Sequence, residues 1–93
     1  MPKTVSTAIA PRFSRRVTLD PSNIPAGQTS VETFTVKGLR TSMCLNVNGP
    51  NLETGVKVVS ARVSAKDELE LTLTNFTGSA VDPASQVFFL VAL

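Results

Sequence analysis

Two carboxylates, Glu68 and Glu70, are the side chains whose types and spacing come closest to a catalytic pair. Residues two apart in a strand share one face at about 7 Å, near the separation that glycoside hydrolases use between their two carboxyl groups. Residues 68–74 read ELELTLT, and this alternation predicts a strand with both acids on the solvent side. A wet strand face does not raise a carboxyl pKa as acid catalysis requires. We therefore expect no catalytic residue; a weak carbohydrate-active enzyme is the alternative, which Glu68→Gln would test.

The rest of the sequence offers little for catalysis or for binding a cofactor. It has no His, Trp or Tyr, a single Cys, and seven carboxylates without the spacing of a calcium-binding loop. We expect no metal, no cofactor and no small-molecule substrate. Cys44 lies in an apolar run, which predicts a buried, inert thiol. Residues 75–77 (NFT) match the N-glycosylation pattern, and we expect the match to be incidental because no secretory signal is found.

Positive charge is concentrated at the N-terminus. Residues 1–19 hold four cations and no acid, whereas residues 20–93 hold five cations and seven acids. A basic arm ahead of a mildly acidic body favours docking to an acidic surface of a partner or of a neighbouring copy. A solvated, flexible terminus is the alternative that the sequence leaves open. Four cations and one aromatic residue are too few for a nucleic-acid interface, so no nucleic-acid partner is expected.

Strands, and not helices, are predicted along the chain. Val, Ile and Thr make up 25 of the 93 residues. Apolar alternation between turn residues predicts six strands, at residues 15–19, 31–37, 43–47, 56–63, 68–74 and 86–93. The apolar phase of 56–63 shifts after Val58, which predicts a β-bulge or a change of partner sheet. Residues 86–93 are apolar on both faces, so this strand is expected at the centre of a sheet or against another subunit.

These strands predict an all-β fold, a small antiparallel β-sandwich or jelly roll with an extended N-terminal arm. With 42% hydrophobic and 17% charged residues, the chain is expected to fold as one small domain at 15–93, preceded by the basic arm at 1–14. Adjacent residues of a strand face opposite sides, so Phe88 and Phe89 are expected to divide between the core and a subunit interface. No apolar run of about 18 residues is found, which predicts a soluble protein without a membrane partner.

From Val17 onward the chain resembles small β-sandwich virion proteins of tailed bacteriophages, of the head decoration or cement type. The stretches that carry the resemblance are VTLDPSNIPAG at 17–27, ETFTVKGL at 32–39, VSARVSAKDEL at 59–69 and NFTGSAVDP at 75–83. The order of these stretches, a hairpin followed by an Asn turn, an Asp-Pro segment and a closing strand, is unusual. The resemblance implies a protein on the capsid exterior, made in the host cytoplasm, with three copies at symmetry axes and an extended terminus on the major capsid protein.

The arm lies outside the resemblance, and its capsid contact is inferred from its charge. We expect Lys3, Arg12, Phe13, Arg15 and Arg16 to contact the major capsid protein, because a basic segment can bind an acidic shell. Oligomerisation, as a homotrimer, would supplement the modest core of a chain without disulfides or metals. A tail, fibre or spike module with the same sandwich is the alternative, although the absence of Trp and Tyr disfavours glycan binding.

Overall fold

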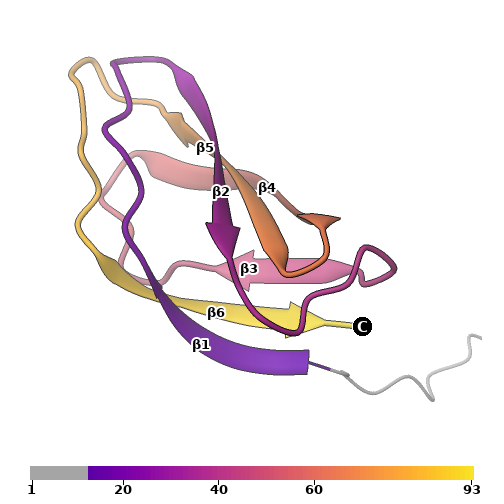
Figure 1. The fold of residues 1–93 in the computed structure, drawn as a ribbon. Coiled ribbons are helices and arrows are strands. Elements are labelled where there is room, and N and C mark those ends of the chain that lie inside the picture. Colours follow the sequence, from indigo (N-terminus) through magenta and orange to yellow (C-terminus); the bar gives the residue numbers. More distant parts are fainter. Residues whose placement is uncertain (1–12) are drawn as a thin grey trace, which may run out of the picture.

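The computed structural model describes residues 13–93, which form two three-stranded antiparallel sheets packed as a sandwich (Figure 1). One sheet has the order β1-β6-β3 and the other β2-β5-β4. The strands are β1 (Phe13–Leu19), β2 (Thr29–Thr35), β3 (Leu45–Asn48), β4 (Val56–Ala65), β5 (Glu68–Asn75) and β6 (Gln86–Ala92). The predicted all-β sandwich is confirmed. Residues 1–12, with Lys3 and Arg12, lie outside the described residues.

The first strand extends further than the sequence predicted. Strand β1 begins at Phe13, two positions before the expected Arg15, because Phe13 pairs with Ala92 at the end of β6. The Phe13 side chain is partly buried and packs against the core. Phe13 and Ser14 therefore belong to the sandwich and not to the arm.

The β2-β5-β4 sheet follows the alternation that the sequence predicted. Leu69, Leu71 and Leu73 of β5 are fully buried, whereas the intervening Glu and Thr residues of this strand are partly exposed. Strand β4 contains the predicted bulge: its register shifts between Val58 and Ser60, so Val59 projects outward and is 51% exposed. A second register shift, which was not predicted, lies between Val63 and Ala65.

The turn between β4 and β5 holds the connection from β2 in place. Asp67 has a φ of 61°, a left-handed conformation that Asp tolerates better than most residues. Its Oδ1 accepts a hydrogen bond from the Gly38 amide at 2.8 Å. Its backbone amide donates to the Leu39 carbonyl at 2.9 Å, and its carbonyl accepts from the Val36 amide at 2.9 Å. Because Val36 and Leu39 are buried, these contacts fix the loop that closes one end of the core.

Strand β6 is the centre of the other sheet, as expected for a segment that is apolar on both faces. It pairs with β1 on one side and with β3 on the other. Phe88, Leu90 and Ala92 are fully buried between the two sheets. Since every second residue of a strand faces the same side, Val87 and Val91 project from the opposite face, where they are more than a third exposed.

Both strands on one side of the sandwich, β1 and β2, are edge strands that carry a charged residue at an inward-facing position. Arg15 is paired with the buried Leu90, and its Nη1 donates to the Lys37 carbonyl at 2.8 Å. Glu32 is paired with the buried Leu71, and its Oε1 accepts from a backbone amide of the loop after β1 at 2.8 Å. Inward-pointing charges discourage edge-to-edge pairing between molecules, because docking another strand would strip them of water.

Candidate binding face

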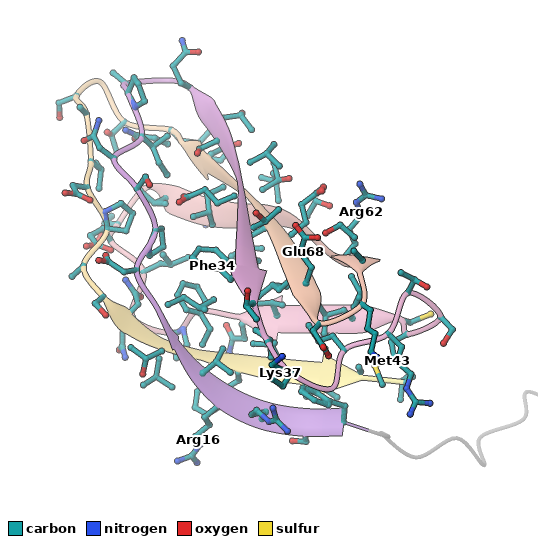
Figure 2. All side chains as sticks on the ribbon, viewed as in Figure 1. Arg16, Phe34, Lys37, Met43, Arg62 and Glu68 are labelled. Atoms are coloured by element: carbon teal, nitrogen blue, oxygen red, sulfur yellow. The ribbon has the colours of Figure 1, made fainter. Side chains whose placement is uncertain are left out.

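The two carboxylates Glu68 and Glu70 lie on the outer face of the β2-β5-β4 sheet, and one of them is held in an ion pair. Glu70 is bound by Arg62 of β4, whose Nε and Nη2 donate to the two carboxylate oxygens at 2.9 and 3.1 Å. The hydrogen bond from Arg62 lowers the pKa of Glu70, opposite to the shift that a catalytic acid needs. Glu68 lies on the same outer face, paired with Thr35 and Ala65. In Figure 2 the labelled Arg62 and Glu68 lie on the β2-β5-β4 sheet, away from the core.

A groove of about 480 Å³ lies beside β3 and β4 and the loop that connects them. Its apolar wall includes Val47, Leu52 and Val58, and its polar groups include Glu53 and Lys57. Glu53 is already engaged, because its Oε2 accepts from a backbone amide of the loop before β6 at 2.9 Å. This hydrogen bond lowers the pKa of Glu53. Within residues 13–93, no group of three or more His, Cys, Asp or Glu side chains is arranged to hold a metal ion.

The cations predicted to contact a capsid are placed differently by β1. Arg15 and Arg16 point to opposite faces of the strand. The Arg15 guanidinium lies 4.6 Å from the centre of the Phe13 ring at the strand edge. Arg16 is exposed on the outer face, where its guanidinium lies 5.0 Å from the centre of the Phe89 ring. Figure 2 shows Arg16 projecting from β1 away from the other sheet. Only Arg16 is therefore part of an exposed sheet face.

We call the solvent side of the β1-β6-β3 sheet the outer β6 face. Its middle is apolar, with Val87 (38% exposed), Phe89 (partly buried) and Val91 (37% exposed) along β6. Polar residues border this column on both sides. The strand registers place Ser14, Arg16 and Thr18 along β1, Asn46 and Asn48 along β3, and Cys44 beside the exposed Leu93. An apolar centre with a polar rim is the usual composition of a protein interface.

The structure separates the two Phe residues that were predicted to divide between core and interface. Phe88 is fully buried among the core residues of its own chain, so it has no surface to offer a second subunit. Phe89 lies on the outer β6 face under Arg16. Of the pair, Phe89 alone remains a candidate interface residue.

The prediction of a buried Cys44 is wrong, because its thiol is exposed. Cys44 pairs through its backbone with Leu93, while Met43 and Leu45 pack against the core. Neighbouring residues of an extended segment face opposite sides, so the inward positions of Met43 and Leu45 turn Cys44 outward. The alternation was present in the sequence, and the apolar surroundings of the residue concealed it.

The charged side chains are unevenly distributed between the two ends of the sandwich. The end where β1 begins carries cations from three loops or strands, while the opposite end is mainly acidic. The first group is Arg15, Lys37, Arg40 and Lys66 beside Asp67 and Glu68, and the second is Asp20, Glu53 and Asp82 beside Lys57. The basic end is the one from which residues 1–12, with two further cations, continue.

Comparison of this chain with protein-family models, with curated proteins and with solved structures finds no match. In the part of the chain that the structure describes, no helix is long and apolar enough to cross a membrane.

Proposed function

We propose that this protein is a capsid decoration protein of a tailed bacteriophage, which binds the exterior of the assembled head and stabilises it by bridging subunits of the major capsid protein. A protein that binds only the assembled shell stabilises it by mass action, because its binding energy is lost when the shell comes apart. Such a role needs a folded module and a contact surface, and it needs no catalytic group.

The outer β6 face is the observation that supports this proposal most. An antiparallel sheet with one face in water normally carries polar residues on that face, as β5 does in the other sheet. Strand β6 instead presents Val87, Phe89 and Val91 there, next to the basic strand β1. The resemblance of the chain from Val17 onward to phage virion modules supports the same role, and the cations at the basic end suit an acidic shell.

The proposal includes three copies meeting at a symmetry axis of the shell. Its test uses heads purified from a phage that lacks the gene for this chain. Purified protein should bind these heads to a fixed saturating ratio, in multiples of three copies per site, and raise the temperature at which they release their DNA. Binding to tails and not to heads would overturn the proposal in favour of a tail, fibre or spike module.

A further inference from the structure

We propose that the outer β6 face docks on a protein surface that presents a carboxylate set among apolar side chains, with Arg16 as the anchoring contact. This inference rests on the proposed function, in which the surface belongs to the assembled shell. It names the contact face and the chemistry of the partner, and it moves the main contact from the arm to the sheet.

The two sheets of this chain provide an internal comparison. Each has a central strand, β5 or β6, whose backbone hydrogen bonds are satisfied on both sides. The outward positions of β5 are Glu68, Glu70, Thr72 and Thr74, all polar. The outward positions of β6 within the strand, in contrast, are all apolar. Val and Phe form strands readily, so β propensity permits this column; what points to a partner is that Val87 and Val91 lie exposed beside Phe89 on a central strand.

Among the described residues of this face Arg16 is the only charged side chain, and no acidic side chain of residues 13–93 pairs with it. Within the described residues the one salt bridge joins Arg62 to Glu70, and residues 1–12 contain no Asp or Glu. The Phe89 ring holds the Arg16 guanidinium from one side by a cation–π contact. The guanidinium is thereby oriented, and within residues 13–93 its N–H groups donate no hydrogen bond. Arg16 lies at the edge of the apolar column and is stacked on Phe89 within it, and Arg and aromatic residues are enriched among interface hot spots.

Charge argues against a second copy bound face to face. In a two-fold symmetric dimer the same patch meets itself, so each Arg16 would face only residues of the outer β6 face. None of those residues has an acidic side chain. Both guanidinium groups would lose water without gaining a side-chain carboxylate, which disfavours the dimer. A different surface could pair a carboxylate with Arg16 and cover Val87 and Val91 with apolar groups.

The test measures binding of the full chain to heads that lack it, by co-sedimentation over a range of protein concentrations. Arg16→Gln should weaken binding about tenfold or more, the effect of losing a charge-assisted hydrogen bond. Arg16→Lys keeps the charge but loses the planar guanidinium, so its affinity for heads should lie between those of the wild type and Arg16→Gln. Lys57→Gln is the matched control, because it removes an exposed cation from the other sheet.

The apolar column is tested with a matched pair of valines. Val91→Thr should weaken head binding several-fold, while Val31→Thr, at a 60% exposed site on the other sheet, should not. Thermal unfolding of each variant checks that the fold is intact. If the wild type binds heads and Arg16→Gln binds equally well, the inference is wrong and the proposed function stands.

Two further outcomes would overturn the inference that the outer β6 face binds the shell. If the wild type binds no heads, the proposed function fails and the inference fails with it. If the free protein is an oligomer by light scattering and Arg16→Gln or Val91→Thr lowers its mass, the outer β6 face is an interface between copies, and the inference is overturned.

Discussion

Replacing Asn75 by alanine should remove the polar centre of one end of the sandwich. The Asn75 side chain is fully buried at the end of β5, although residues 75–77 have the form of a glycosylation site. Its Nδ2 donates to the carbonyls of Ile24 at 3.0 Å and Ser79 at 2.9 Å. Its Oδ1 accepts from the amide and the hydroxyl of Thr77, at 2.9 and 2.6 Å. One amide side chain thus joins β5 to the loops on both sides of the isolated bridge between Ile24 and Val81.

The loss of stability in Asn75→Ala depends on which polar groups keep a hydrogen-bond partner. Without the amide, the Ile24 carbonyl still accepts from the Val81 amide at 3.0 Å. The Thr77 hydroxyl has a single proton, and once Asn75 is removed it can donate to the Ser79 carbonyl, 2.8 Å away. The Thr77 amide loses its acceptor. An unpaired buried donor costs about 1–3 kcal/mol, and the partly buried Thr77 amide belongs at the lower end of that range. The lost packing and hydrogen bonds of the fully buried Asn75 side chain add about 1–2 kcal/mol. We expect the free energy of unfolding to fall by about 2–4 kcal/mol, which lowers Tm by at least about 8 °C in a domain of this size.

Thermal unfolding followed by far-UV circular dichroism measures this effect, because the chain has no Trp or Tyr to report by fluorescence. Asn51→Ala is the control, since it makes the same change at an exposed loop position. Asn75→Asp should also be destabilised at neutral pH, because a carboxylate would face two carbonyl oxygens, and it should recover stability as acid protonates it. If Asn75→Ala unfolds at the same temperature as Asn51→Ala, the reasoning is refuted.

Three other predictions concern the loops and one strand edge. Gly55→Ala should lower Tm strongly, because Gly55 has a φ of +86° and a Cβ there would clash with the Thr77 methyl. Gly78→Ala should leave Tm unchanged, because a Cβ at Gly78 would meet open space. The lowered pKa of Glu53 stabilises the fold above the unfolded pKa of about 4.3, and this contribution is lost as pH falls through the folded value. Glu53→Gln should therefore have a lower Tm at pH 7, and its difference from wild type should vanish in acid; a constant difference would contradict this. Glu32→Val should raise light scattering on mild heating by making an edge strand apolar; unchanged solubility would count against the edge-protection argument.

Much of the fold was predictable from the sequence because strand patterns are local. Alternation placed Leu69, Leu71 and Leu73 in the core, and the phase shift after Val58 identified the first bulge. The apolar composition of residues 86–93 indicated a central strand, which β6 is. Each of these features depends on which side of one extended segment a residue faces, and a period of two fixes that without knowledge of the rest of the chain.

The ion pair between Arg62 and Glu70 shows where such prediction stops. Without the second register shift near Ser64, the turn between β4 and β5 would place Arg62 opposite Leu71 and Val63 opposite Glu70. The extra residue moves Arg62 onto the outer face opposite Glu70. There Arg62 binds the Glu70 carboxylate, which the sequence offered as one member of a possible catalytic pair. A single inserted residue leaves a weak signal in sequence, and it changes every pair that follows.

The sequence by itself determined the class of fold, the strands and the side of the strand on which most residues lie. Tertiary structure decided which strands share a sheet, and so it decided the outer β6 face: Arg16 and Phe89 are far apart in the chain and meet only because β1 pairs with β6. It also decided that Asn75 is a buried hydrogen-bonding centre. These features depend on contacts between segments brought together by folding, whereas alternation within a strand is set by the covalent geometry of neighbouring residues.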